Sequence, residues 1–387
     1  MKRLLLLLTL LLIAPALTTA QNDTGWPVIE RCVGEPTAPP DDWTFDGTIL
    51  LRGYAGIHGV NAAWETPRVV AFLRNKDWQG NDMDLPGGAL SPNGRWYASP
   101  FGSREVTDTW NTITQVNQIR IYDLLEGKVT IRDWPGSTYY GGSNGQIHWL
   151  DDQTLIQDTF TQGTLILNPF SGEVKSWTLL DDLFDVYVGR GAFFSPDAAQ
   201  VVYRATEFDS GWYLVNIPQK SIVQANLPIS LDNTAIVWAS DSKRLFAEIS
   251  SEISHTIAQF DSNGLLIGNI FNLSNDNRVS STSLHLSYTS DYLAFVEATV
   301  DLSVFNMVGG LYIASLRTQE ILDPCIETSG SLMWSPKANQ IALQGSNFSH
   351  EIIELMIFDL DNWQVYKVAN QINPDNFPDE IIGWRAD

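Results

Sequence analysis

The chain has 387 residues, with 45 Asp and Glu against 23 Lys and Arg and a formal net charge of −22. A surface of that sign repels phosphate backbones and anionic lipid, which excludes nucleic acid and membrane surfaces as expected partners and favours cations or basic proteins. The alternative is that the charge only keeps the protein soluble.

The first residues, MKRLLLLLTLLLIAPALTTA, predict a secretory signal peptide over residues 1–20. Two basic residues precede an apolar run from Leu4 to Leu17, and Thr18 and Ala20 are the small residues before a cut at Gln21. An uncleaved anchor is the alternative, but the run is shorter than the roughly 20 residues of a membrane span. We therefore expect a secreted or periplasmic protein without a membrane span.

Residues 21–40 form a Pro-rich amino-terminal segment that contains Cys32, one of only two cysteines. The other is Cys325. In the oxidising compartment that a signal peptide implies, we expect one disulfide between them, with two free buried thiols as the alternative. The bridge would tie ERCVGEPTAPPDDW to a loop near the carboxyl end.

Residues 41–387 are predicted to form one domain, built from a repeated strand–turn–strand segment. Each copy has a short apolar strand, a polar turn and a second apolar strand. In chain order the copies are GGALSPNGRWYAS from Gly87, GQIHWLDDQTLIQD from Gly145, GAFFSPDAAQVVYR from Gly191, AIVWASDSKRLFAE from Ala235, LHLSYTSDYLAFVE from Leu284 and SLMWSPKANQIALQ from Ser331. The carboxyl-terminal IIGWRAD from Ile381 begins a further copy.

The residue just before each turn gives the period of the repeat. Successive anchors of this kind are 59, 45, 44, 50, 46 and 50 residues apart, and a period of about 40 to 50 residues with several strands indicates a β-propeller. The anchors are Leu90, Trp149, Phe194, Trp238, Tyr288, Trp334 and Trp384.

The segments between the copies complete the blades. Stretches such as IRIYDLLEGKVTI and LMIFDLDNWQVYKV place apolar strands on both sides of a polar turn, which is typical of antiparallel hairpins. No window with helical periodicity competes with them. We predict an all-β propeller of four-stranded antiparallel blades, with seven blades preferred and six or eight left open by an insertion from Ser103.

The two ends of the domain are predicted to share one blade. DDWTFDGTILLRG from Asp41 and RVVAFLRN from Arg68 supply middle and outer strands but no clear innermost strand. The terminal IIGW offers the missing strand, and a ring closed in this way leaves no open seam with unpaired backbone groups.

The aromatic-Ser-Pro-Asp/Asn-Gly turn, followed by YDL- or YIA-type strands, resembles the WD-like propeller repeats of the TolB type. Such repeats also occur in the propellers of prolyl oligopeptidase and dipeptidyl peptidase relatives. The resemblance is strong at Ser91, Ser195 and Ser335 and weaker elsewhere, where LDD, ASD, TSD and RAD replace the motif. The peptidases carry their catalytic serine in a separate hydrolase domain, and this sequence has no G-x-S-x-G motif.

The repeated residues themselves are predicted to be structural. Ser and Asp in such turns bond nearby backbone groups, and Pro presets φ, so Ser91, Ser195 and Ser335 are interpreted as turn residues. The anchor tryptophans share one position in the repeat and are expected to pack between blades.

No cofactor is predicted, although calcium stays possible. The five histidines show no zinc spacing, and His148 and His285 fall on strands expected to line the channel. Acidic stretches such as DDQT from Asp151 and NPDNFPDE from Asn373 could supply calcium ligands from different blades. A lactonase- or esterase-like hydrolase with a channel calcium ion is therefore the alternative function.

The preferred function is a non-catalytic binding module with a protein or glycan partner, and we expect a monomer. Propellers bind at the loops that enter the innermost strands, and aromatic side chains with a few polar groups suit such a patch. The predicted ligand-binding residues are Tyr139, Tyr140, Asn144, Tyr187 and Arg190.

Overall fold

The computed structural model describes most of the domain. The described residues are 25–53, 56–64, 67–73, 83–84, 88–106, 112–140, 147–159, 163–177, 192–204, 211–229, 236–250, 255–273, 279–301, 306–345, 354–370 and 380–386. Every regular element in these ranges is a β-strand. No helix in them is long and apolar enough to cross a membrane. The predicted signal peptide lies outside the described residues.

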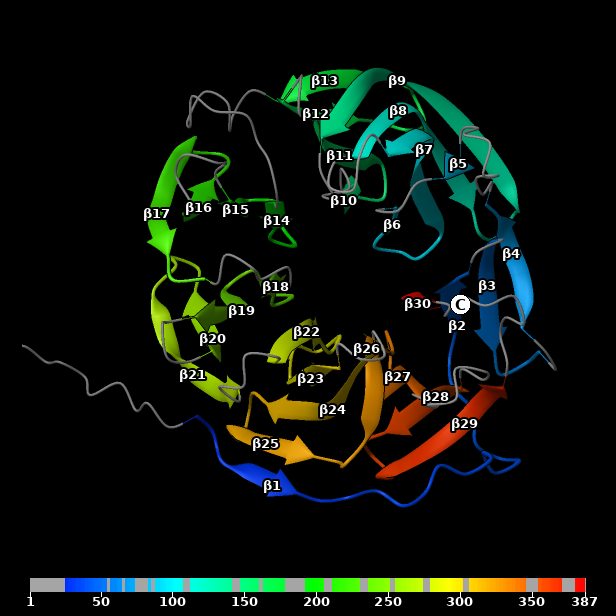
Figure 1. Ribbon diagram of the computed structural model, residues 1–387, viewed down its shortest axis with the longest axis vertical. Coiled ribbons are helices and arrows are strands. Elements are labelled where there is room, and N and C mark those ends of the chain that lie inside the picture. The colour runs from blue at the N-terminus through cyan, green and yellow to red at the C-terminus, as the bar shows by residue number, and fades with distance from the viewer. Residues whose placement is uncertain are drawn as a thin grey trace, which may run out of the picture.

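The strands form a ring of sheets that fan outward from a common centre, which confirms a propeller (Figure 1). Five sheets are separate, and within them neighbouring strands pair antiparallel. From the centre outward, four of the orders are β30-β2-β3-β4, β10-β11-β12-β13, β14-β15-β16-β17 and β18-β19-β20-β21. In the fifth, β5 and β6 both pair with β7, which continues to β8 and β9.

The bounds of these strands follow the predicted repeat. They are β2 (Thr48–Arg52), β3 (Gly56–Asn61), β4 (Arg68–Phe72), β30 (Glu380–Arg385), β5 (Met83–Asp84), β6 (Ala89–Leu90), β7 (Trp96–Val106), β8 (Thr112–Asp123), β9 (Lys128–Tyr140), β10 (Ile147–Asp151), β11 (Thr154–Thr159), β12 (Gly163–Leu167), β13 (Val174–Trp177), β14 (Ala192–Phe194), β15 (Gln200–Arg204), β16 (Trp212–Asn216), β17 (Ser221–Leu227), β18 (Ile236–Trp238), β19 (Arg244–Ser250), β20 (His255–Asp261) and β21 (Leu266–Leu273).

The sixth sheet has nine strands and contains two consecutive four-strand runs. The first run is β22 to β25 and the second is β26 to β29. They are joined where β24 pairs with β26, at Gly309–Thr328 and Gly310–Glu327. The strands are β1 (Val28–Glu30), β22 (Val279–Leu286), β23 (Tyr292–Asp301), β24 (Asn306–Ser315), β25 (Glu320–Asp323), β26 (Glu327–Trp334), β27 (Gln340–Gly345), β28 (Glu354–Asp359) and β29 (Gln364–Asn370).

The carboxyl-terminal strand closes the ring, as predicted. β30 is the innermost strand of the sheet that contains β2, and its Trp384 pairs with Ile49. Arg385 is buried at the end of β30, and it donates to the carbonyl of Leu124 in the neighbouring sheet and to Thr48 Oγ1. The last strand of the domain therefore pairs with its first strand, β2, and also contacts the next sheet.

The hydrophobic core lies between neighbouring sheets. One cluster joins Leu50 and Ile57 to Tyr97 and Tyr122, and equivalent clusters fill other sheet-to-sheet interfaces. Fully burying a large apolar side chain stabilises a fold by about 1.5–3 kcal/mol, so these interfaces hold the ring together.

The repeated serines make the inner turns, as predicted. Ser91 Oγ accepts from the amide of Trp96 at 2.9 Å, and Ser195 Oγ accepts from the amide of Gln200 at 2.9 Å. Ser335 accepts from Lys337 at 3.3 Å, and all three serines are buried. Their hydroxyls are therefore occupied with the turn backbone.

The anchor predicted at Tyr288 is wrong. Ser287, one residue earlier, accepts from the amide of Tyr292 at 3.0 Å and is the counterpart of Ser195, so the anchor is Leu286. Tyr288 lies in the turn and is 70% exposed. The stretch SYTSD offers two successive Ser/Thr turn starts, and burial of Leu284 and Ser287 selects the earlier one.

Three of the four anchor tryptophans bridge neighbouring units. The indole Nε1 donates to an innermost-strand carbonyl of the preceding unit, which confirms packing between blades. The bonds are Trp149 to Ala89 at 3.0 Å, Trp238 to Phe193 at 2.9 Å and Trp334 to His285 at 2.9 Å. Trp384 instead donates to the carbonyl of Asp46, just ahead of β2 in its own sheet.

The outer turn of each unit repeats as well. Asp123 Oδ1 accepts from the amides of Leu125 and Glu126, where β8 turns into β9. The equivalent residue in other units is Asn168, Asn216, Asp261, Ser315 or Asp359, and each accepts from an amide two to four residues ahead. A side-chain acceptor at this position fixes the turn between the third and fourth strands.

Candidate functional site

The structure locates two of the five predicted binding residues. Tyr139 and Tyr140 are the last residues of β9, where they pair with Thr114 and Ile113 of β8. Asn144, Tyr187 and Arg190 lie outside the described residues. The prediction is therefore located in part and is not tested as a site.

Tyr139 and Tyr140 belong to the sheet with the longest strands among the described residues, in which β7, β8 and β9 pair in succession. β7, β8 and β9 have 11, 12 and 13 residues. The second and third strands of the separate sheets elsewhere have five to seven residues. Pairing of β7 with β8 continues to Val106–Thr112. The insertion expected from Ser103 thus extends the strands of this sheet.

A second long hairpin is formed by β23 and β24, which have 10 residues each. Their pairing continues to Asp301–Asn306. Both long hairpins join the second strand of a unit to the third. The inner turns at Ser91 and Ser287 join the first strand to the second, so they lie at the opposite end of the strands. The two long hairpins therefore extend at the same end of the ring.

Partial burial disfavours the charged form of the two inner-strand histidines. His148 on β10 and His285 on β22 keep partial solvent exposure, and burial lowers the pKa of each to about 4. Desolvation disfavours the charged imidazolium when no acid lies close enough to compensate. Both side chains are therefore expected to be uncharged at neutral pH.

Another histidine has an acidic partner that sequence reasoning missed. His255 Nδ1 lies 2.9 Å from Glu248 Oε1, with the carboxylate side chain 7% exposed and the imidazole 43% exposed. Such a carboxylate can fix the ring tautomer and leave Nε2 available as a base or ligand. The pair joins neighbouring strands β19 and β20, and only its seven-residue spacing in the sequence hinted at it.

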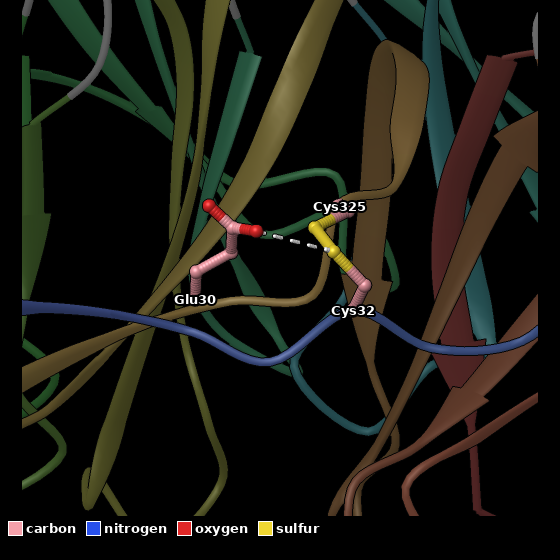
Figure 2. A group of neighbouring side chains, drawn as sticks. All are labelled: Glu30, Cys32 and Cys325. Carbon is pink, nitrogen blue, oxygen red and sulfur yellow. Dashed lines mark hydrogen bonds between the residues drawn. A yellow bond between two sulfur atoms is a disulfide. The ribbon is translucent and has the colours of Figure 1, made fainter.

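Only one group of three candidate metal ligands occurs among the described residues, namely Glu30, Cys32 and Cys325 (Figure 2). The two cysteines form the expected disulfide, which confirms that prediction. The thiolate, not the disulfide, is the metal-binding form of cysteine. The Glu30 carboxylate lies 3.8 Å from Cys32 Sγ, and a disulfide sulfur has no proton to donate to it. In its oxidised form the group does not fit a metal ion.

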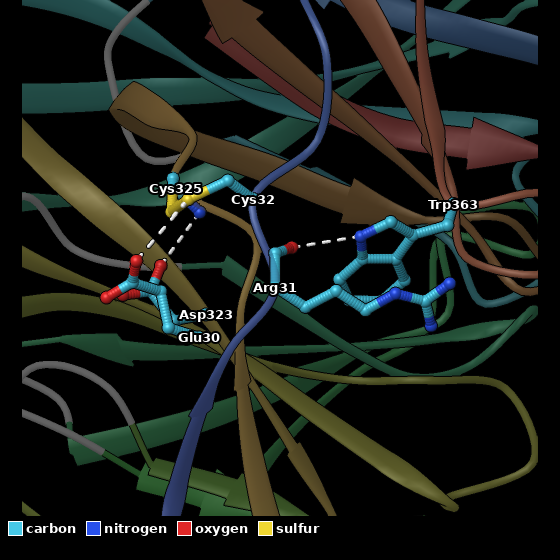
Figure 3. Close-up of a disulfide and its surroundings, with 6 residues drawn as sticks. All are labelled: Glu30, Arg31, Cys32, Asp323, Cys325 and Trp363. Carbon is cyan, nitrogen blue, oxygen red and sulfur yellow. Dashed lines mark hydrogen bonds between the residues drawn. A yellow bond between two sulfur atoms is a disulfide. The ribbon is translucent and has the colours of Figure 1, made fainter.

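The disulfide fastens the amino-terminal segment to the outside of the ring (Figures 1 and 3). Val28, Ile29 and Glu30 of β1 pair in parallel with β25, the outermost strand of its run. Beyond it, Arg31 stacks on Trp363, with the guanidinium carbon 4.4 Å from the ring centroid. The Trp363 indole donates to the carbonyl of Arg31 at 2.9 Å.

Comparison with known proteins adds no family to this description. No protein-family model matches the sequence, and no curated protein does. Among solved structures, the chain is similar to hydrazine synthase from Kuenenia stuttgartiensis, at 13% identity and a TM-score of 0.46 over 74% of this chain and 81% of that one. It is also similar to the β-propeller domain of Cps50 (Swd1) from Myceliophteria thermophila, at 12% identity and a TM-score of 0.44 over 78% of this chain and 94% of that one. The likeness concerns the fold alone, and the TolB-type resemblance stays a prediction.

Proposed function

We propose that this chain is a non-catalytic, protein-binding propeller that works outside the cytoplasm. In this proposal the nine-stranded sheet counts as two blades, which makes seven with the five separate sheets. The partner is held at the end of the ring where the β7–β8 and β23–β24 hairpins extend. The observation that carries the proposal is that the pairing of these hairpins extends to Val106–Thr112, past a bulge at Phe101–Gly102, and to Asp301–Asn306.

Long paired strands suit recognition because they extend side chains away from the ring while the backbone keeps a fixed conformation. Each strand pair keeps its backbone hydrogen bonds, so little further ordering is needed when a partner binds. Tyr139 and Tyr140 are the last residues of β9, which pairs with β8 along the longer hairpin, and tyrosine is enriched at protein interfaces.

The charge of the chain favours a basic partner. A net charge of −22 attracts positively charged surfaces and speeds their encounter at low ionic strength. The same charge opposes binding to nucleic acid, as the sequence predicts. A basic protein is therefore our preferred partner class over a neutral glycan.

The test shortens each projection at a paired position. One variant replaces residues 104–114 with Asn-Gly, which forms a tight hairpin turn between the paired residues Ser103 and Gln115. A second replaces residues 300–307 in the same way between the paired residues Thr299 and Val308. The matched control is Leu125→Ser, in the outer turn at the opposite end of the strands.

Crosslinking of the mature protein to extracytoplasmic proteins would identify the partner, and titration would then give its affinity. We expect the shortened variants to keep the unfolding midpoint of wild type within a small margin and to lose about tenfold or more in affinity, with Leu125→Ser unchanged. Equal affinity in all four proteins would refute the proposed site. A melting temperature that rises with calcium and falls with chelator would favour the calcium hydrolase instead.

A further inference from the structure

The amino-terminal segment forms a strap, residues 25–43, along the outside of the β18–β21 sheet and of both runs of the nine-stranded sheet. It starts beside β21, where the amide of Trp26 donates to the carbonyl of Ile270 at 2.7 Å. It then adds β1 to the edge of β25. Finally it reaches β29, where Thr37 pairs with Tyr366. In Figure 1 this segment lies outside the rim over the same sheets.

The first half of the strap is held at the surface. Besides the disulfide, it is held by Trp26 and Val33 packed against two core clusters, by Arg31 stacked on Trp363 and by backbone bonds to β21 and β25. All three residues of β1 are exposed, and Val28 and Ile29 keep 48% and 41% of their surface in water. Glu30 pairs directly with Asp323, so two carboxylates lie side by side on neighbouring strands (Figure 3). Like charges opposite one another destabilise strand pairing, and solvent-exposed backbone hydrogen bonds add little net stability.

The second half is anchored in the core. The Trp43 indole donates to Asp359 Oδ2 at 3.0 Å, and its ring lies 4.4 Å from that of Tyr366. Phe45, two residues later, is buried against Trp384. A segment whose start is held at the surface and whose end is fixed in the core can swing away from the rim without unfolding the ring.

The bridge in the first half of the strap is accessible to solvent, because both Cys32 and Cys325 are exposed. We propose that this disulfide is a redox latch, which releases residues 25–36 from the edge of β25 when it is reduced. The proposal does not depend on the binding site described above.

The reaction is a thiol–disulfide exchange with a dithiol. A thiolate of the reductant attacks one of the two sulfurs and forms a mixed disulfide, and the second reductant thiol then displaces the protein sulfur. The reductant becomes a disulfide, and Cys32 and Cys325 take up two electrons and two protons in total.

The acidic surroundings select the reductant. Glu30 lies against Cys32 Sγ, and Asp323 accepts from the amide of Cys325 at 2.8 Å (Figures 2 and 3). A negatively charged thiol such as glutathione is repelled here, whereas a neutral dithiol or a dithiol protein with a basic face is not. The latch should therefore discriminate between reductants by charge.

Release uncovers a strand edge. The amide of Ile321 donates to the carbonyl of Pro27 at 2.9 Å while the strap is in place. When the strap leaves, that amide and the rest of the edge of β25 are free to exchange with solvent or to pair with another strand.

Hydrogen exchange on the full mature chain tests the latch. After complete reduction by dithiothreitol, confirmed by mass after thiol labelling, amide exchange in residues 26–33 and 320–323 should accelerate about tenfold or more. Exchange in β28 should stay at the oxidised rate. Unchanged exchange at Ile321 after full reduction would overturn the proposal, and so would acceleration throughout the ring, since that would make the disulfide a general stabiliser.

Two variants separate the latch from its charge selectivity. The double variant Cys32→Ser/Cys325→Ser should show the released pattern without reductant; if it does not fold, reduction of folded wild type carries the test alone. Glu30→Gln should speed reduction by glutathione several-fold relative to dithiothreitol. Equal acceleration by both reagents would overturn the charge selectivity.

Discussion

The indole of Trp334 donates to the backbone carbonyl of His285 at 2.9 Å, which ties the innermost strand of one unit to that of the unit before it. Trp149 and Trp238 make the same bond two units apart from one another in the chain. In the intervening units the anchor is Leu90, Phe194 or Leu286, so the bond recurs in every second unit. The repeat of this propeller is therefore partly a repeat of pairs.

The first prediction concerns this bond. Trp334→Phe should lower the free energy of unfolding by about 1–3 kcal/mol, because the His285 carbonyl then lacks its buried donor. Phenylalanine is accommodated at the same position by Phe194, so a clash is not expected. Urea unfolding followed by circular dichroism gives the difference. The control, Tyr288→Ser, changes a 70% exposed side chain and should stay within about 0.5 kcal/mol. A Trp334→Phe midpoint equal to that of Tyr288→Ser would contradict the role of the bond.

The second prediction uses the outer turns. Asp359 accepts from Trp43 and Gln340 as well as from the turn amide of Asn362. Asp359→Asn replaces one carboxylate oxygen with an NH2 group, which is a donor facing other donors. We expect the free energy of unfolding to fall by about 1–3 kcal/mol. Asp261→Asn is the matched control, because asparagine serves the same turn in other units and, among the described residues, the Asp261 side chain accepts only from its own turn. Equal effects of the two substitutions would show that the bonds to Trp43 and Gln340 add nothing.

Asp359 also gives the fold an acid dependence. Burial alone would raise the pKa of its carboxyl, but the hydrogen bonds from Trp43, Asn362 and Gln340 outweigh burial and lower the pKa below its ordinary value. The unfolded state then binds the proton more readily, so this part of the stability is present above the ordinary pKa and is lost as pH falls through the native value. Asp359→Asn should remove it, and the unfolding midpoint of the variant should change less with acid than that of wild type.

The third prediction concerns the inner-strand histidines. Their pKa is lowered from 6.5 to about 4, so the unfolded chain protonates first, and stability should fall as pH drops from 6.5 toward 4. The free energy of unfolding should fall by at most about 3 kcal/mol for each histidine. His148→Phe should flatten this slope, since Phe193 fills the equivalent place in another unit. Met333→Leu, at the equivalent place without a titrating group, should leave the slope unchanged. Equal slopes in wild type and His148→Phe would contradict the prediction.

The sequence carries much of this fold because its signals are local and repeated. Ser91, Ser195 and Ser335 mark the inner turns by their neighbours alone, and the terminal IIGW finds its place because the first unit lacks an inner strand. The single disulfide follows from there being two cysteines and a predicted export signal. None of these inferences needs a distance between remote residues.

What escaped sequence reasoning depends on register and on remote packing. Tyr288 was the wrong anchor because two turn starts compete and burial decides between them. The parallel pairing of β1 with β25 has three residues and no periodicity to reveal it. Glu248 meets His255 only through the register of β19 with β20. The predicted binding residues Tyr139 and Tyr140 are located by the strands, but their role depends on a partner and no fold signal reports it.

The last prediction concerns ring closure. Deleting residues 380–387 removes β30, which exposes the paired edge of β2 and takes Ile381 and Trp384 out of the core cluster with Ile49. The loss of two large buried side chains and a strand's backbone bonds should exceed about 5 kcal/mol, enough to abolish cooperative unfolding in a domain of ordinary stability. Arg385→Met, which keeps the strand but removes the bonds to Leu124 and Thr48, should lower the free energy of unfolding by about 1–3 kcal/mol.

A synthetic peptide of residues 378–387 added to the truncated chain should restore the cooperative unfolding transition, since the open edge of β2 has the pairing pattern that β30 used. If the truncated chain unfolds at the wild-type midpoint without peptide, β30 does not close the ring in solution.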